Sequence, residues 1–287
     1  MNGTKPVNWG IIGPGTIART FAGGIAHSRT GNLVAVGTRN PGKPDLAEKF
    51  PGARIVEGYQ ALIDNPDVEA VYIATPHVGH VEWAIKAIRA GKHVLVEKPI
   101  ALSSHQAEAI YHEARKAGVF AGEAYMYRLH PQTAKLVELV KAGAVGEIRL
   151  IKSSFGFDMG SVKAGHRLFA NDLAGGGILD VGGYPVSMAR LIAGATEGKP
   201  FAEPEKVFGV GHLGETGADE WASALLQFPG GIVAEVSCSI MAKQDNVLRI
   251  IGSKGRIEVA DFWFASGHEG GTGRIEIIRN DGTQETV

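Results

Sequence analysis

Two patterns of apolar positions alternate along the first 122 residues. Short, nearly continuous apolar runs are separated by segments in which apolar side chains return every three or four positions. The runs predicted as strands are 7–12, 33–36, 70–74, 93–96 and one that begins at 119. Because strands buried on both faces read as continuous apolar runs, this alternation predicts a doubly wound parallel sheet covered by helices. We therefore assign residues 1–122 to an α/β domain.

The ends of the predicted helices are marked by residues that favour helix termini. Ser103 or Ser104 can cap a helix that runs to Lys116. Gly91 and Gly118 follow apolar-periodic segments, where glycine commonly ends a helix. These signals place helices before the strands at 93–96 and 119.

The pattern changes in residues 123–287. A predicted helix over 131–142 precedes a strand over 148–154. Short runs without helical periodicity follow at 232–237, 247–251 and 256–259, each soon ended by Gly or Asp. The second domain is therefore predicted to be α+β, with a mainly antiparallel sheet and one or two helices.

Composition narrows the class of protein. With 44% hydrophobic and 21% charged residues, the chain is typical of a folded globular protein. A formal net charge of −1 argues against a nucleic-acid partner. The single cysteine, Cys238, excludes an internal disulfide and a multi-cysteine zinc site, and the ten histidines show no paired metal-ligand spacing. Since no apolar run reaches the length of a membrane span, we expect a cytoplasmic protein without metal or membrane contacts.

A glycine-rich loop follows the first predicted strand. Gly13-Pro14-Gly15-Thr16-Ile17-Ala18 matches G-x-G-x-x-G/A and opens the first predicted helix. In this arrangement the first glycine permits the tight turn, the second lets a pyrophosphate approach, and the helix N-terminus favours its negative charge. The loop predicts a dinucleotide site; the alternative is a plain glycine turn.

The end of the second predicted strand bears on the choice of dinucleotide. An acidic residue there would bind the ribose hydroxyl of NAD, whereas arginine accommodates the additional phosphate of NADP. The chain has Thr38-Arg39-Asn40, without an acid and with Lys43 nearby. This favours NADP over NAD, unless Arg39 is a solvated loop residue.

A lysine follows another parallel strand. Lys98, between Glu97 and Pro99, lies at a carboxyl strand end, where open α/β sheets bind ligands. Such a lysine can hydrogen-bond a substrate hydroxyl, lower its pKa and take part in proton transfer. The alternative is a surface Lys–Glu pair.

Together, several motifs resemble the Gfo/Idh/MocA oxidoreductase family, in particular its branch of sugar C1 and dihydrodiol dehydrogenases. They are the glycine loop, Ala-Thr-Pro-His at 74–77 with His80, and Ala-Gly-Lys-His-Val-Leu-Val-Glu-Lys-Pro at 90–99. The similarity continues through 123–131 and 175–190. It implies an N-terminal Rossmann domain, an open-faced C-terminal sheet and NAD(P)-linked chemistry on sugars or cyclic polyols, with Lys98 as the catalytic lysine. The residues expected to bind the cofactor are Gly13, Gly15, Thr16, Ile17, Thr38, Arg39, Thr75, Pro76, His77, His80, Glu97, Lys98 and Arg167.

The second domain carries further candidates. If the segment is helical, Asp180 and Tyr184 share a face, and a tyrosine can act as acid or base at a hydroxyl. Spacing alone equally allows a buried structural tyrosine and a capping aspartate. The resemblance favours a catalytic function, because the family has an aspartate followed four residues later by histidine or tyrosine. His166 departs from the tryptophan common before Arg167, and His77 stands where many relatives have asparagine. Tyr127, Arg128 and His130 are secondary pocket candidates.

Two expectations concern the chain as a whole. Family members usually continue into a C-terminal helix, so a chain that stops at Val287 predicts either a truncation or a different end of the second domain. A broad exposed sheet face in that domain is a natural surface for a homo-oligomer.

Three functions are compatible with these residues. The leading hypothesis is a hydride transfer between nicotinamide and a hydroxyl-bearing carbon of a sugar, cyclitol or cyclic diol. In it, Tyr184 accepts the hydroxyl proton with the help of Lys98. The first alternative is a glycosidase that retains its NAD and oxidises the sugar transiently. The second is a dinucleotide sensor without catalysis, which would need neither side chain.

Overall fold

The computed structural model describes residues 5–162, 165–264 and 273–287. The chain forms two compact units, Met1–Ala124 and Tyr125–Val287. In the part of the chain described, no helix has both the length and the apolar character needed to cross a bilayer.

The first unit is built around a six-stranded parallel sheet in the order β3-β2-β1-β4-β5-β6. Its strands are β1 (Val7–Ile12), β2 (Gly31–Thr38), β3 (Arg54–Glu57), β4 (Ala70–Ile73), β5 (His93–Glu97) and β6 (Ala121–Ala124). Its helices are α1 (Thr16–Ala26), α2 (Leu46–Lys49), α3 (Tyr59–Ile63), α4 (His80–Arg89), α5 (Ser104–Ala117) and the short η1 (His77–Gly79). The strand order reverses between β1 and β4, which makes the carboxyl ends of these strands the expected ligand edge. The predicted doubly wound Rossmann sheet is confirmed.

Alternate side chains of each strand serve the two faces of this sheet. Ile11 packs with Ala18 of α1, whereas Ile12 belongs to the cluster that contains Ala84 of α4 and Ile110 of α5. All of these side chains are buried. The two clusters fix the strand ends that carry the candidate residues.

The predicted cap of α5 is observed. The Ser103 hydroxyl accepts a hydrogen bond from the Gln106 amide, and Gly118 ends the helix with a φ of 68°. The predicted strand beginning at 119 is instead Ala121–Ala124, because Val119 and Phe120 form the connection after the helix. The four-residue strand β3 was not predicted from the sequence.

The second unit contains an eight-stranded sheet in the order β14-β13-β12-β11-β7-β10-β9-β8. Its strands are β7 (Ile148–Gly156), β8 (Lys206–Leu213), β9 (Asp219–Gln227), β10 (Val233–Ser239), β11 (Leu248–Gly252), β12 (Gly255–Val259), β13 (Glu276–Arg279) and β14 (Gln284–Thr286). Neighbouring strands are antiparallel except β7 and β10, which are parallel. The mainly antiparallel sheet is confirmed, although β8, β9, β13 and β14 were not predicted.

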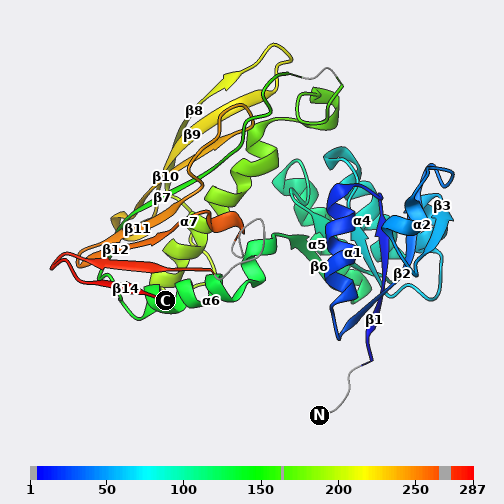
Figure 1. Cartoon of the computed structure of the whole chain (residues 1–287), viewed down its shortest axis with the longest axis horizontal. Coiled ribbons are helices and arrows are strands. Elements are labelled where there is room, and N and C mark those ends of the chain that lie inside the picture. Colours follow the sequence, from blue (N-terminus) through cyan, green and yellow to red (C-terminus); the bar gives the residue numbers. More distant parts are fainter. Residues whose placement is uncertain (1–4, 163–164, 265–272) are drawn as a thin grey trace. The chain divides into compact units, whose positions relative to one another are not determined.

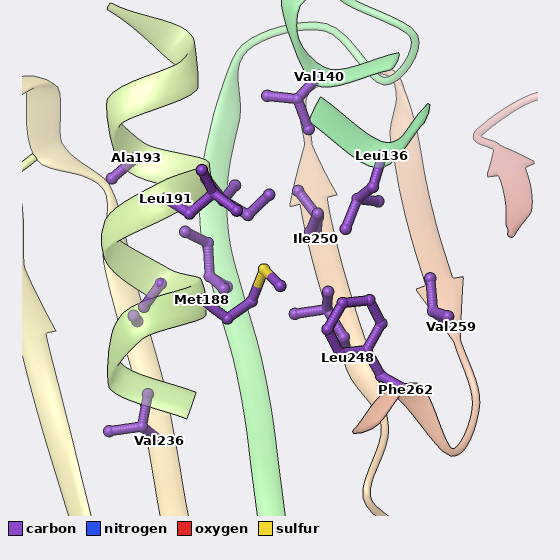
Figure 2. Packing of buried hydrophobic residues seen from close by; sticks show 14 of the residues in the cluster. Leu136, Val140, Met188, Leu191, Ala193, Val236, Leu248, Ile250, Val259 and Phe262 are labelled. Atoms are coloured by element: carbon purple, nitrogen blue, oxygen red, sulfur yellow. The ribbon is translucent and has the colours of Figure 1, made fainter. Parts of the chain in front are cut away.

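Two long helices, α6 (Pro131–Lys141) and α7 (Gly183–Thr196), pack in this unit, with α7 along one face of the sheet (Figure 1). Figure 2 shows Met188 of α7 directed toward the strand that carries Leu248 and Ile250. These three side chains are fully buried in the main apolar cluster of the unit. The cluster anchors α7, whose N-terminal end continues the segment that carries Asp180.

The remaining short helical segments are η2 (Met126–Leu129), η3 (Asn171–Leu173), η4 (Ile178–Gly182), η5 (Pro229–Gly231) and η6 (Phe262–Phe264). The segment η4 is a π-helical turn that runs directly into α7. Asp180 therefore precedes α7 instead of lying in its regular part. Paired glycines and Pro185 near the start account for this late beginning of the α-helix.

Candidate functional site

The glycine loop of the first unit has the geometry of a pyrophosphate cradle. Gly13 has a φ of +90°, and a Cβ atom built on it would lie 2.8 Å from the Ala74 carbonyl oxygen. Gly15 precedes α1, and a Cβ atom at this position would meet nothing within 4 Å, so the space in front of the helix is open. The N-cap residue Gly15 has no side chain to cap the helix, which leaves its first amides available to an anion. These features fit a dinucleotide, with Thr16 and Ile17 exposed on the first turn of α1.

The end of β2 presents one buried and one exposed candidate. Thr38 is buried, and its hydroxyl accepts a hydrogen bond from the Asn40 amide at 3.2 Å. This bond shapes the turn after β2. Arg39 lies between them with its side chain exposed. The guanidinium is therefore accessible to a ligand at this edge of the sheet.

His80 joins two loops at the carboxyl edge of the same sheet. Its Nδ1 lies 2.7 Å from the Pro99 carbonyl oxygen, and its Nε2 lies 2.9 Å from the Thr75 carbonyl oxygen. The ring is almost completely buried, and burial lowers its pKa against the opposing effect of the two carbonyls. Because carbonyls only accept, a neutral ring donates to one of them, and a protonated ring could donate to both. The imidazole thus links the segment of Thr75 to that of Lys98.

Thr75, Pro76 and His77 form the connection after β4. Pro76 precedes η1, and His77 is buried with its ring 5.7 Å from that of His80. The Thr75 hydroxyl is buried and has no hydrogen-bond partner among the described residues. A buried hydroxyl of this kind is a site at which a bound ligand can supply the missing partner.

The backbone around Lys98 is fixed by side chains from three strands. The Lys98 amide donates to Glu97 Oε2 at 3.2 Å, and Tyr72 donates through its hydroxyl to Glu97 Oε1. On the other side, the Ile100 amide donates to Glu123 Oε1 at 2.8 Å. The peptide bond between Lys98 and Pro99 is cis. These contacts hold Lys98, which is half-buried, at the carboxyl end of β5.

Glu123 is a residue that the sequence interpretation did not select. Burial raises the pKa of its carboxyl, the hydrogen bond from Ile100 opposes this, and Glu97 adds to the rise. Lys98 lowers the same pKa, so the Glu123 carboxyl responds to both charged neighbours at this edge of the sheet. The sequence offered one signal for Glu123, its place near the end of β6. The carboxyl ends of the parallel strands β5 and β6 lie at the same edge of the sheet, so Glu123 lies near Lys98.

The second unit brings Arg167 and Asp180 together. Arg167 Nη1 donates to Asp180 Oδ1 at 2.9 Å. The Asp180 side chain is 6% exposed and that of Arg167 is 49% exposed. The pair therefore carries a buried carboxylate whose partner reaches the surface, an arrangement that can orient a polar ligand.

Tyr184 lies one turn after Asp180 at the start of α7 and is 5% exposed. Its ring makes edge contacts with Tyr125, Phe155 and Trp263, with centroid separations of 4.9, 5.0 and 5.4 Å. An enclosure of this kind fixes the orientation of the ring. Both interpretations of Tyr184, structural and catalytic, are compatible with it.

The secondary candidates have structural partners. Tyr127 donates from its hydroxyl to Ser187 Oγ at 2.8 Å. His130 caps α6 by accepting from the Gln132 amide, and His166 accepts from the Leu168 amide. Arg128 stacks over Phe201. Each contact shapes a loop or a helix end.

The described residues contain neither a cluster that could bind a metal ion nor an ionised thiol. No group of three or more His, Cys, Asp or Glu side chains in that part of the chain could hold a metal ion. Burial raises the pKa of the Cys238 thiol to about 12, with a contribution from Asp219. The thiol is therefore protonated at neutral pH.

The fold and the glycine cradle place the chain in the class of dinucleotide-binding proteins. An oxidoreductase family model described as an NAD-binding Rossmann fold matches residues 7–125, and the GFO/IDH/MocA C-terminal domain matches residues 133–258. The chain belongs to the Gfo/Idh/MocA oxidoreductase family, which confirms the resemblance seen in its motifs.

Three known proteins illustrate this relationship. The chain is 34% identical over 260 residues to trans-1,2-dihydrobenzene-1,2-diol dehydrogenase of Mus musculus, covering 90% of this chain and 75% of that protein. A 3-ketoreductase from Actinomadura kijaniata, solved with NADP and TDP-benzene, is 29% identical with a TM-score of 0.84 over 99% of this chain and 84% of that one. Aldose-aldose oxidoreductase from Caulobacter crescentus, solved with glycerol, is 26% identical with a TM-score of 0.85 over 99% of this chain and 83% of that one.

Proposed function

We propose that the protein is an NADP-dependent dehydrogenase or reductase acting on a hydroxyl-bearing carbon of a sugar, cyclitol or cyclic diol. The observation that carries the proposal is the fixed position of Lys98, at the end of β5 on the sheet edge that also carries the glycine cradle. The related proteins act, by their names, on a cyclic diol, on a ketone and on aldoses. A secondary alcohol or its ketone is the chemistry these substrates share.

When bound, the nicotinamide supplies the acceptor or donor of the hydride. The substrate oxygen then has to lose or gain a proton, which is the task we assign to Lys98 and Tyr184. The Lys98 ammonium donates a hydrogen bond to that oxygen and favours the alkoxide. The Tyr184 hydroxyl gives the oxygen a proton during reduction, and the Tyr184 phenolate takes the proton back during oxidation. Asp180, held by Arg167, orients the substrate.

The preference for NADP rests on the end of β2. The exposed Arg39 can pair with the additional phosphate, and the buried Thr38 hydroxyl holds the turn that presents it. No acidic residue stands at Thr38, Arg39 or Asn40 to bind the ribose hydroxyl of NAD.

The test is an absorbance assay of nicotinamide reduction with purified protein, NADP⁺ or NAD⁺, and pools of aldoses, cyclitols and cyclic diols. Lys98→Ala should lower kcat by about 100-fold or more, the usual contribution of a positioned proton-transfer group. Tyr184→Phe, which keeps the ring and its aromatic contacts, should also lower kcat. Equal turnover by the parent protein and both variants would refute the assigned proton chemistry.

The same screen, run with aryl glycosides, distinguishes the retained-cofactor glycosidase. That enzyme would cleave the glycoside without net reduction of the nicotinamide. Binding of NADP without turnover of any pool would instead favour the sensor.

We also propose that the exposed face of β8 and β9 joins two copies of the chain. Phe208, Val210, Trp221 and Leu225 are large apolar side chains that are 43–69% exposed. They lie on neighbouring strands at the edge of the sheet. An apolar sheet face of this kind is typical of an interface between subunits.

A further inference from the structure

The three consecutive glycines before η4 form a junction between separate segments of the second unit. The Gly176 amide donates to the Leu168 carbonyl at 2.8 Å. A Cβ atom on Gly175 would lie 2.6 Å from the same carbonyl oxygen. The loop that carries Arg167 is therefore packed directly against bare glycine backbone.

Asp219, the first residue of β9, reaches the same glycines from the other side. Its Oδ2 accepts a hydrogen bond from the Ile178 amide at 2.6 Å. A Cβ atom on Gly176 would lie 2.1 Å from Asp219 Oδ1, and the φ of Gly176 is +111°. Only glycine permits this approach of a carboxylate, so the residue type at Gly176 and the position of Asp219 depend on each other.

The hydrogen bond from Ile178 places Asp219 at the start of the turn that carries Asp180. Ile178 is the first residue of η4, and Gly177 before it offers no side chain to cap the turn. The Asp180 amide donates to the Gly176 carbonyl at 3.1 Å. Asp219 thus supplies, from a distant strand, the acceptor that a capping residue normally provides.

A second contact ties the β8–β9 connection to the same loop. Asn171 Nδ2 donates to the Thr216 carbonyl at 2.7 Å. A Cβ atom on Gly217 would lie 2.9 Å from that amide nitrogen. The loop between Arg167 and Asp180 is therefore attached to the hairpin at two separate points.

We infer that Asp219 is a positioning residue, which holds η4 so that Asp180 meets Arg167 in the geometry that substrate binding requires. The inference rests on the proposed function of Asp180. The hydrogen bond needs an acceptor of aspartate length but not a negative charge. Asparagine can therefore replace Asp219, whereas a longer side chain would press against Gly176.

The test compares three variants of the full chain in the nicotinamide assay. Asp219→Ala should lower kcat by about tenfold or more, because small misplacement of an orienting group is costly. Asp219→Asn should retain most of the activity, and Asp219→Glu should not, although it keeps the charge. The KM for the dinucleotide, which binds the first unit, should remain that of the parent protein. Should the alanine variant fail to fold, the contrast between asparagine and glutamate carries the test.

A double-mutant cycle with Asp180→Asn shows whether Asp219 acts through Asp180. In the Asp180→Asn background, Asp219→Ala should cause little further loss of kcat. If the kcat losses of the two single variants multiply in the double variant, the inference is overturned. It is also overturned if Asp219→Ala keeps the kcat of the parent protein. An Asp180→Asn variant with unchanged kcat would overturn the proposed role of Asp180 and this inference with it.

Discussion

Two glycines of the same loop should respond in opposite ways to one added methyl group. Gly15 has a φ of −79°, which alanine adopts readily, and its Cβ would meet no protein atom within 4 Å. Gly15→Ala should therefore fold with unchanged or slightly higher stability, by about 0–1 kcal/mol. The added methyl group would project into the space that the pyrophosphate needs.

The loss of affinity follows from the contacts that the methyl group displaces. A hydrogen bond from a backbone amide to a charged group is worth about 1.5–3 kcal/mol. Losing one such bond to the pyrophosphate would weaken NADP⁺ binding by about 10- to 150-fold. Isothermal titration of NADP⁺ against the parent protein and the variant measures this change directly.

Gly13→Ala is the matched control, because its cost falls on the fold. The φ of +90° and the contact at 2.8 Å with the Ala74 carbonyl strain any side chain at this position. We expect a loss of about 1–3 kcal/mol in the free energy of unfolding, visible as a lower Tm. A Gly15→Ala variant that is destabilised as much as Gly13→Ala, or that binds NADP⁺ like the parent, would refute this prediction.

Three further outcomes test other parts of the molecule. Arg39→Ala should raise the Kd for NADP⁺ by about 10- to 150-fold, because one hydrogen bond to the charged phosphate is lost. The Kd for NAD⁺, which lacks this phosphate, should remain unchanged. The pKa of Glu123 is raised in the folded state, so the unfolded chain loses this proton at a lower pH than the folded chain. Between the two pKa values, a rise in pH should therefore lower the free energy of unfolding of the parent relative to that of Glu123→Gln. Denaturant unfolding across that range measures the difference, and a parent that gains stability relative to the variant as pH rises would contradict it. Phe208→Glu should lower the molar mass found by light scattering. Val207→Glu, on the other face of β8, should not lower it. The same molar mass for both variants would argue against the proposed interface.

The first unit was predictable because its signals are local. Apolar runs, the capping Ser103 and the terminal Gly118 each act within a few residues, and all were recognised from the sequence. Strand β3 has only four residues with two of them exposed, so no apolar run marks it. Strand β4 also has four residues but all are buried, so burial, more than length, decided which strands could be predicted.

The second unit shows where sequence patterns stop being informative. All eight residues of β8 are exposed, so the alternation that reveals a half-buried strand is missing. The parallel pairing of β7 with β10 joins residues about 80 positions apart, and nothing in either run specifies direction. Such features depend on the assembled sheet.

The candidate site residues also divide into those marked by local sequence motifs and those that depend on the assembled sheets. Lys98 and Asp180 were selected from short motifs, and the structure gives each a defined set of contacts. The residues that hold them, Glu123 and Asp219, come from strand ends 23 positions from Ile100 and 41 positions from Ile178. For Glu123 the end of a parallel strand was an available signal, but Asp219 has none, because its contact with Ile178 exists only after the strands of the second unit have paired.

The abundance of glycine has a physical explanation at only some positions. Many of the 40 glycines, such as Gly52 and Gly58, have a positive φ and open space around them, as expected of turns. Gly13 and Gly176 differ, because a neighbouring backbone carbonyl or carboxylate occupies the place of the missing side chain. In both cases the approaching group belongs to a segment that carries or holds candidate site residues. Close approach explains why these two positions require glycine, but it does not by itself mark function, because Gly252 and Gly255 also lie against backbone carbonyls and Gly15 lies in open space.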